Sequence, residues 1–334
     1  MADDQRVATI EDVAREAGVS RQTVSNVVNR PSIVREVTRL KVQAAIDALG
    51  YSPNAVARRL RRRRTSTIGV KLDAYSGGVS GVVLDRFVHA LTEHASSRGL
   101  RVLVYAARTL EEELGYLNEF ADGGEVDAII LTGTALGDPR AERLSARGTP
   151  FAAFGRPWGV EDAGHPWVDI DGAAGTKAAT EHLLRRAGER VAYLGWPSDS
   201  GTGDDRERGW RRAMGERRAP LLTTTEGVGE GQEAIRRLLE EDVDGVDGIV
   251  CASDALAIGA HLAAVRAGQP NLQIVGFDNT AAAEAIGISS VEQLPERVAS
   301  GLLEMLMGTE GTEIRRGQAP EPTGMLVEPR LIVR

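Results

Sequence analysis

The sequence predicts an α/β protein in which a small N-terminal helical domain is joined to a larger body of doubly wound parallel sheets. Three observations support this fold class. Three short helical patterns occupy the first 50 residues, the charge balance changes sign near residue 65, and short apolar strands alternate with amphipathic helices from residue 67 onward. A chain of 334 residues is long enough to hold both parts.

Positive charge is concentrated at the N-terminus. Residues 1–65 hold 13 Lys and Arg against seven Asp and Glu, a balance of +6, whereas residues 66–334 hold 27 against 41, a balance of −14. A small basic module on an acidic body is typical of a protein whose first part binds nucleic acid. The overall net charge of −8 therefore does not argue against DNA binding.

The first 50 residues predict a helix-turn-helix. Thr9 and Asp12 form a capping-box pattern at the start of one helix, and Gly18 interrupts that helix before a second one that Ser20 can cap. A third helix is expected over residues 36–49. Two short helices joined by a tight turn and braced by a third form this motif.

The second helix, running to about Asn29, carries an exposed polar stripe. Arg, Gln and Asn side chains can each form bidentate hydrogen bonds with base edges in the major groove. A plain three-helix bundle with a solvated polar face would show the same stripe, but it would leave the tight turn and the basic charge unexplained. The stripe comprises Arg21, Gln22, Ser25, Asn26 and Asn29.

An arginine-rich segment, residues 51–66, leaves the helical domain. It has helix propensity but is too short to be stable alone, and self-repulsion among Arg61 to Arg64 is expected to keep it loose until phosphates neutralise it. Leu60 is an apolar residue flanked by arginines. It is either an ordinary helix contact or a wedge for the minor groove.

The rest of the chain alternates strand and helix patterns, as parallel sheets require. About ten such units exceed what one sheet normally carries, so we expect two lobes with a ligand cleft at the carboxyl ends of their strands. The expected strands cover residues 67–72, 101–105, 127–132, 150–154, 190–194, 248–252 and 272–277, and the clearest helices cover residues 83–98, 175–187, 232–240 and 255–266.

Polar residues just past these strands are the candidate ligand contacts. Asp and Arg suit the paired hydroxyls of a sugar, and an aromatic ring such as that of Trp158 can stack on its apolar face. A Trp is more often a core residue, and an Asp after a strand is often a helix N-cap, of which Asp254 is the clearest case. The candidates are Asp73, Arg156, Asp171, Arg206, Ser253, Asp254, Asp278 and Gln293.

Several of these segments together resemble the lactose-repressor (LacI/GalR) family, and the resemblance spans nearly the whole chain. The N-terminal segments are Thr9 to Ser20, Gln22-Thr-Val-Ser25, Val27-Val-Asn29 and Gly50-Tyr51-Ser-Pro53-Asn54 running to Leu60. The later ones are Arg206-Glu-Arg-Gly209-Trp210, Ser253-Asp254-Ala255-Leu256-Ala257-Ile258-Gly259 and Val275-Gly276-Phe277-Asp278-Asn279.

The resemblance assigns roles to particular residues. It implies base contacts by Arg21, Gln22 and Asn26, although Asn26 departs from the arginine of the best-known members. It also implies a hinge helix over residues 54–62 that orders on DNA, with Leu60 as its intercalating residue. DNA-backbone contacts are expected from Thr9, Ser20, Thr23, Ser25, Asn29, Asn54 and Arg58. The expected effector contacts are Asp73, Arg156, Trp158, Thr202, Arg206, Ser253, Asp278 and Gln293.

The resemblance also implies a body with the type I periplasmic-binding-protein fold, whose lobes meet at three crossovers near residues 156–160, 286–291 and 319–324. The expected domains are residues 1–50 for DNA binding, 51–66 for the hinge and 67–334 for effector binding and dimerisation. Lobe 1 is expected at about 67–157 with 290–320, and lobe 2 at about 158–289 with 321–334.

These features together predict a transcriptional repressor that binds a palindromic operator as a homodimer and is controlled by a small molecule. A sugar is the family's commonest effector; a nucleobase or nucleoside, or no ligand at all, are the alternatives. A transport-type binding protein would not need the helix-turn-helix, and no nucleophile elbow, metal-ligand cluster or phosphate-cradling loop indicates an enzyme. No cofactor or metal is expected. The single cysteine, Cys251, and the lack of a signal peptide or apolar span predict a bacterial cytoplasmic location.

Overall fold

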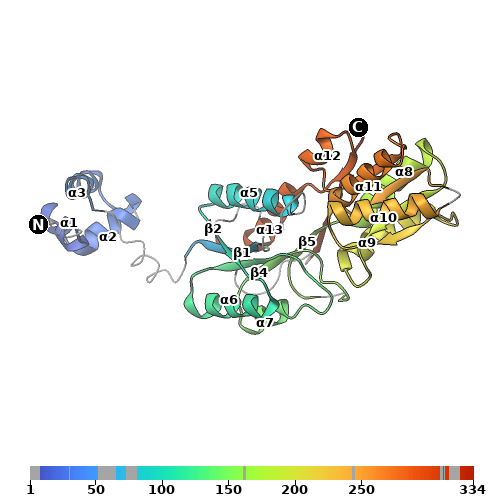
Figure 1. The fold of residues 1–334 in the computed structure, drawn as a ribbon. Coiled ribbons are helices and arrows are strands. Elements are labelled where there is room, and N and C mark those ends of the chain that lie inside the picture. Colours follow the sequence, from blue (N-terminus) through green and yellow to red (C-terminus); the bar gives the residue numbers. More distant parts are fainter. Residues whose placement is uncertain are drawn as a thin grey trace, which may run out of the picture. The chain divides into compact units, whose positions relative to one another are not determined.

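The computed structural model divides the chain into two compact units, Met1–Thr65 and Ser66–Arg334, each with its own core (Figure 1). No helix in the part of the chain that the structure describes is long and apolar enough to cross a membrane. The structure describes residues 8–29, 31–51, 65–72, 81–160, 163–242, 245–308, 311, 313–315 and 324–334.

The N-terminal unit is a three-helix domain. Its helices are α1 (Ile10–Glu16), α2 (Arg21–Asn29) and α3 (Glu36–Leu49), with a 3-10 turn at Pro31–Ile33. The predicted capping box is confirmed, because the Thr9 side chain accepts from the Asp12 amide while the Asp12 carboxylate accepts from the Thr9 amide. Buried Val13, Val24 and Val42, one from each helix, form the centre of its core.

Two six-stranded sheets form the body, as the sequence predicts. All strand pairs are parallel except that of β10 with β12. The first sheet has the order β11-β5-β4-β3-β1-β2 and comprises β1 (Thr67–Leu72), β2 (Arg101–Ala106), β3 (Ala128–Leu131), β4 (Phe151–Phe154), β5 (Trp167–Ile170) and β11 (Gly324–Val327). The second has the order β12-β10-β9-β8-β6-β7 and comprises β6 (Val191–Gly195), β7 (Leu221–Thr223), β8 (Gly248–Cys251), β9 (Gln273–Phe277), β10 (Ser289–Glu292) and β12 (Arg330–Ile332).

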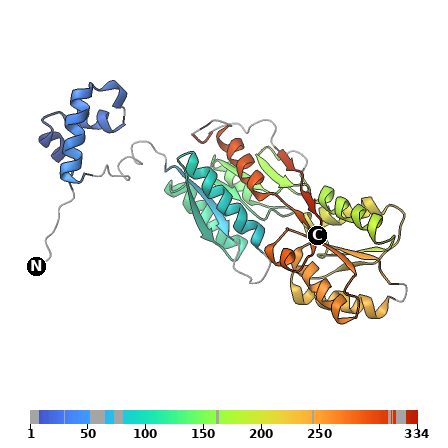
Figure 2. The same cartoon turned by 90° about the horizontal axis from the view of Figure 1, so that it is seen from above.

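Helices cover both faces of the first sheet. Figures 1 and 2 show α5 (Val82–Ser97) beside α13 (Pro295–Met307), and these two helices share one apolar core with the sheet. On the other side, α6 (Leu110–Gly123) and α7 (Arg140–Ala146) pack over a second apolar core.

In the second lobe α8 packs against α9 and α10 against α11, while the short α12 precedes β10. Together with the sheet they bury one continuous core around Tyr193, Leu256 and Phe277. These helices are α8 (Gly172–Arg186), α9 (Gly201–Met214), α10 (Val228–Glu241), α11 (Asp254–Arg266) and α12 (Ala281–Ala285).

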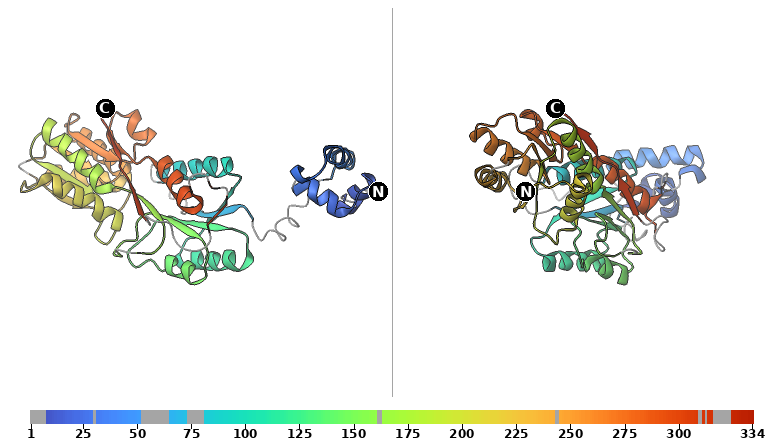
Figure 3. Two further views of the ribbon diagram at one scale, coloured as in Figure 1. Left: turned by 180° about the vertical axis from the view of Figure 1, so that it is seen from behind. Right: turned by 90° about the vertical axis from the view of Figure 1, so that its right-hand side faces the viewer.

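The crossovers between the lobes lie later in the chain than predicted. β5 and β11 belong to the first sheet and β10 to the second, so the chain changes lobes near Asp171, at residues 293–294 and at residues 328–329 (Figure 3). The predicted lobe boundaries at 157/158, 289/290 and 320/321 are therefore wrong. The strand pattern at Trp167–Ile170 was missed, and the Gly- and Pro-containing stretch before it returns to the same sheet instead of leaving it.

Close packing of α8 on α9 depends on Gly209. A Cβ atom there would lie 2.2 Å from the carbonyl oxygen of Ala173, far inside contact distance. This contact fixes the position of α9, which carries Asp205 and Arg206 one turn earlier.

We therefore expect Gly209→Ala to lower the free energy of unfolding by about 1–3 kcal/mol, the usual cost of overpacking. Gly115→Ala is the matched control, because Gly115 also lies inside a helix but faces open space. That control should gain up to about 1 kcal/mol from the lower chain entropy of alanine. Urea denaturation of both variants would measure the difference, and equal effects would contradict the close-packing argument.

Candidate functional site

The predicted base-reading residues lie on α2. Arg21 and Gln22 are exposed, and the Gln22 side-chain amide donates to the Asn26 side-chain oxygen at 3.1 Å. Arg21 forms an ion pair with Glu11 at 3.2 Å in which both side chains are more than half exposed. Exposed pairs of this kind are weak, so the guanidinium can exchange Glu11 for another partner at little cost.

The residues predicted to contact the DNA backbone differ in their burial and in their positions on the helices. Ser20 and Thr23 form the N-terminal turn of α2, where the Thr23 amide donates to the Ser20 hydroxyl at 3.1 Å. Ser25 is only 7% exposed, so its predicted place on the exposed stripe is wrong: it lies beside Val24 and one turn before Val28, on the flank of the core face. Thr9 caps α1, and Asn29 ends α2. Asn54, Arg58 and Leu60, the hinge helix 54–62 and Asp73 lie outside the described residues.

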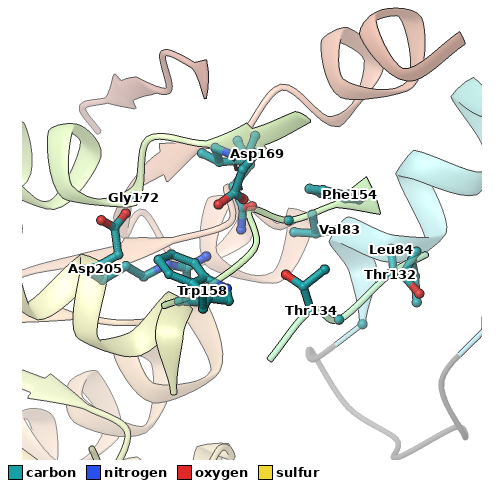
Figure 4. A pocket seen from close by; sticks show the side chains of 16 residues that line it. Val83, Leu84, Thr132, Thr134, Phe154, Trp158, Asp169, Gly172 and Asp205 are labelled. Carbon is teal, nitrogen blue, oxygen red and sulfur yellow. Dashed lines mark hydrogen bonds between the residues drawn. The ribbon is translucent and has the colours of Figure 1, made fainter. Parts of the chain in front are cut away.

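A cavity of about 270 Å³ lies in the body where strand ends of both lobes meet (Figure 4). In this view Asp205 and Trp158 lie at one end, and Val83, Leu84 and Phe154 at the other. The carboxylate of Asp205 thus lies at one end of the cavity, and aliphatic side chains lie beside Thr132 at the other. Its lining comprises Gly81, Val83, Leu84, Thr132, Gly133, Thr134, Phe154, Gly155, Trp158, Asp169, Ile170, Gly172, Thr202, Asp205, Arg206 and Gln293.

The structure brings four of the predicted effector residues to this cavity: Trp158, Thr202, Arg206 and Gln293. Asp278 lies one contact behind, because its carboxylate accepts from the Gln293 side-chain amide at 2.5 Å. Ser253 does not line the cavity; its hydroxyl caps α11 and donates to Glu226 at 2.8 Å.

Two buried donors at the cavity have no hydrogen-bond partner among the described residues. They are Nε of Arg206 and Nε1 of Trp158. Arg206 is otherwise well held: one terminal nitrogen donates to the Ala252 carbonyl, and the guanidinium lies 3.8 Å from the ring centre of Phe277. Because unpaired buried donors are costly, these two favour a ligand that brings acceptor oxygens.

The carboxyl group of Asp278 has a pKa well above the ordinary value for an aspartate. Burial raises its pKa to about 7, Asp254 and Glu226 act in the same direction, and Arg206, with a nitrogen 3.8 Å from the carboxylate, acts against them. Its carboxyl group therefore titrates near neutrality, and the Gln293 amide that donates to it connects its protonation to the cavity.

Three non-glycine residues with strained backbone lie near the crossover from the second sheet to the first lobe. Asp278, Asn279 and Leu294 have φ angles of 119°, 49° and 55°, which non-glycine residues rarely adopt. Glu292, between them, accepts from Arg86 of α5 at 3.0 Å and from the Asn279 side chain at 2.7 Å. Strain of this sort persists only where surrounding contacts enforce it, and it is often found at switch regions.

Arg156 does not line the cavity, contrary to its predicted role as an effector contact. Its guanidinium donates to Asp169 of β5 at 2.7 Å, to the Ile170 carbonyl at 2.9 Å and to Asp205 of α9 at 3.2 Å, and it lies 4.7 Å from the ring centre of Trp158. These hydrogen bonds hold lining residues from both lobes.

Sequence reasoning missed Asp169 and Asp205, which both line the cavity. Asp205 directly precedes Arg206, a predicted contact, so its place beside that contact could have been read from the sequence. Asp169 lies in strand β5, which was not predicted. Asp171 does cap α8, as an Asp after a strand often does. Asp254 is no N-cap, because Ser253 caps α11 and the Asp254 carboxylate accepts from Thr280 and Ser290.

Comparison with known proteins identifies the family. The model "Bacterial regulatory proteins, lacI family" matches residues 9–54, and "Periplasmic binding proteins and sugar binding domain of LacI family" matches residues 84–301. The transcriptional regulator CelR of Thermobifida fusca is 32% identical over 351 residues, covering 99% of this chain and 98% of CelR. The chain belongs to the LacI family. It is a DNA-binding transcriptional regulator.

Solved structures of LacI-family regulators share its fold. A CelR–cellobiose complex superposes with a TM-score of 0.68 at 27% identity and covers 98% of this chain and 99% of that one. The lac repressor dimer bound to operator and the anti-inducer ONPF superposes with a TM-score of 0.80 at 23% identity, with 98% of each chain covered. The predicted family and fold are therefore confirmed.

In this LacI-family regulator we expect Arg156→Gln to lower the free energy of unfolding of the body by roughly 3–5 kcal/mol, because it leaves the Asp169 carboxylate without its cation and the buried Asp205 with only the exposed Arg208. Arg147→Gln is the control: its pair with Asp122 is exposed and should contribute less than about 1 kcal/mol. Urea unfolding curves compare the two, and a small, similar loss in both would show that Arg156 does not hold the lobes together.

Proposed function

We propose that this LacI-family chain is a sugar-responsive repressor, which binds a palindromic operator as a homodimer through α2 and changes its operator affinity when a sugar fills the cavity. The observation that carries the proposal is a cavity lined from both lobes by charged, amide and indole groups, with two unpartnered donors. The solved CelR complex with cellobiose supports the same ligand class.

The chemistry of the cavity suits a sugar. Asp169 offers unused carboxylate lone pairs to ligand hydroxyls, Gln293 and Arg206 offer donors, and the Trp158 ring offers an apolar face. Sugars combine polar edges with apolar faces, so a site that places both kinds of group around one small volume can orient the ring. A nucleobase would make less use of the Asp169 carboxylate, although aromatic stacking on Trp158 would suit it.

The lobe-spanning contacts support an allosteric role. Arg86 and Glu292 join α5 of the first lobe to the crossover that carries Gln293, so a ligand that moves Gln293 or Asp278 acts on that junction. We propose that lobe rotation alters the spacing of the two hinge segments in a dimer, and that Leu60 enters the minor groove at only one spacing. Ligand and operator would then be coupled through one two-state element.

A thermal-shift screen of mono- and disaccharides, including cellobiose, with nucleosides and purines in the same panel, tests the ligand class. The stabilising compound is then added to an operator-binding assay read by fluorescence anisotropy.

We expect Arg206→Ala to keep operator affinity but lose the ligand response, while Arg212→Ala, which changes an exposed residue about two turns along α9, responds as wild type. A normal response in Arg206→Ala would refute the cleft assignment, and stabilisation by purines alone would replace the sugar.

The raised pKa of Asp278 predicts pH-dependent ligand binding. Gln293, which lines the cavity, donates to the Asp278 carboxylate, so a sugar that orders the Gln293 amide favours the ionised carboxylate, and binding should tighten as pH rises through 7. For the stabilising sugar, we expect affinity to rise roughly tenfold between pH 6 and pH 8.

Isothermal titration calorimetry in buffers of different ionisation enthalpy would measure both the affinity and the proton released. In Asp278→Asn, which cannot titrate at this position, the pH dependence should disappear. Affinity that is flat or falls over this range in the wild type would contradict the assignment of Asp278 to the effector site.

A further inference from the structure

The Asp254 carboxylate is completely buried at the start of α11, and none of the functions described so far requires it. We infer that Asp254 is a positioning residue of the effector site. It holds the backbone turn at residues 278–280 and so keeps the Asp278 side chain directed to Gln293, which lines the cavity. This role rests on the proposed effector site, but its main test needs no ligand.

The turn that carries Asp278 needs support from its surroundings. Asp278 and Asn279 have φ angles of 119° and 49°, which side chains other than glycine rarely adopt. Backbone conformations of this kind persist only where neighbouring contacts enforce them. The position of the Asp278 carboxylate therefore depends on whichever groups bind the backbone of this turn.

Asp254 supplies these contacts from α11. One carboxylate oxygen accepts from the Thr280 amide at 2.6 Å and from the Thr280 hydroxyl at 2.8 Å, and the other accepts from the Ser290 hydroxyl at 2.6 Å. The Ser290 oxygen in turn accepts from the Asn279 amide at 2.9 Å. The carboxylate is thereby bonded, directly or through one hydroxyl, to both residues that follow Asp278.

The two hydroxyl groups fix the direction of these hydrogen bonds. The Thr280 oxygen accepts from a backbone amide of α12, and the Ser290 oxygen accepts from the Asn279 amide, so each hydroxyl hydrogen is left to donate to Asp254. Burial raises the pKa of Asp254, whereas these donors and the charge of Arg334 act against the rise. A group that accepts all three hydrogen bonds is best served by the ionised carboxylate, which cannot donate.

Helix capping does not account for this carboxylate. The Ser253 hydroxyl already accepts from the Leu256 amide at 3.2 Å and so caps α11. The fold also leaves space for the Asp254 side chain, because a Cβ atom at Gly276 of β9 would lie 2.2 Å from one of its oxygens. The position of Asp254 in the first turn of α11 lowers the cost of burying its charge, since the helix dipole favours an anion there.

Asp254 also influences the protonation of Asp278. Burial is the main cause of the raised pKa of Asp278. Of the groups that face it, Arg206 of α9 lowers the pKa, Asp254 raises it, the Gln293 amide lowers it, and Glu226, in the segment after β7, raises it. Loss of the Asp254 charge should therefore lower the pKa of Asp278 toward the ordinary range of an aspartate.

The test compares two aspartates at opposite ends of β8 in the full-length protein. Asp254 lies past the carboxyl end of this strand, at the edge of the sheet that carries Asp278. Asp247 precedes the amino end, where its carboxylate accepts from the Arg190 amide at 2.8 Å. Asp254→Asn and Asp247→Asn thus remove the same charge and each weaken a contact to the backbone, but only the first affects the turn at Asp278.

The first measurement follows the protonation of Asp278 in the ligand-free protein. Carboxyl-labelled aspartate is titrated from roughly pH 5 to pH 9 by 13C NMR, and Asp278→Asn identifies the signal. We expect a midpoint near pH 7 in the wild type and in Asp247→Asn. In Asp254→Asn the midpoint should move down by about one pH unit or more.

Ser290→Ala tests the turn without a change of charge, because it removes the hydroxyl that links Asp254 to the Asn279 amide. The signal of the Gln293 side-chain amide reports the hydrogen bond to Asp278, so in the wild type it should follow the Asp278 titration. We expect this response to be lost in both Ser290→Ala and Asp254→Asn and kept in Asp247→Asn. If Asp254→Asn does not fold, Ser290→Ala alone provides the test.

Cellobiose is the ligand probe. By calorimetry at about pH 8, where Asp278 is largely ionised, Asp254→Asn and Ser290→Ala should bind it about tenfold or more weakly than the wild type, and Asp247→Asn should bind it equally well. If cellobiose does not bind the wild type, the proposed ligand fails separately, and the ligand-free measurements still decide the role of Asp254.

A Gln293 response that persists in both Asp254→Asn and Ser290→Ala would overturn the inference, even if both variants unfold at lower urea concentrations than the wild type. A lower Asp278 midpoint in Asp254→Asn with that response intact would likewise refute positioning, because it would reduce the effect of Asp254 to its charge.

Discussion

The guanidinium of Arg156 is the interaction on which the architecture of the body depends most. It extends from the loop after β4 in the first lobe, is held by Asp169 of β5, and reaches Asp205 on α9 in the second lobe. Removing Arg156 would leave the largely buried carboxylate of Asp169 without its cation, which costs far more than an exposed pair contributes. The cluster thereby fixes the relative position of two cavity walls and, through the Trp158 ring, part of a third.

The same cluster also sets the chemistry of the cavity. Its Asp169 carboxylate is oriented by protein donors, so it can present its remaining lone pairs to ligand hydroxyls without rearrangement, which is the usual advantage of a preorganised site. Asp205 serves both purposes, because it closes the N-terminus of α8 and contributes to the lining. A second junction, of Arg86, Glu292 and Asn279, connects α5 to the strained crossover behind Gln293. The ligand site is therefore bounded at both ends by contacts that span the lobes.

Most of the correct predictions depend on interactions between residues that are close together in the sequence. The capping box at Thr9, the helical repeat of Val13, Val24 and Val42, and the charge change near residue 65 depend on neighbours in sequence, and they predicted the helical domain and its polar stripe. The prediction for Ser25 was wrong because one helical position separates an exposed side chain from the flank of the core. The alternation of strands and helices predicted the doubly wound body, but short strands such as β5 and β10 were missed.

The sequence by itself determined the family, the parallel-sheet body and several polar residues placed after its strands, because backbone periodicity and motif spacing are properties of contiguous residues. Only the tertiary structure decided where the chain crosses between lobes, since the same Gly- and Pro-containing loop can either return to a sheet or leave it. It also decided that Arg156 holds the walls of the cavity while Asp205 lines it. The partners of a buried charge come from residues far apart in the chain, so their pairing is a property of the folded cavity alone.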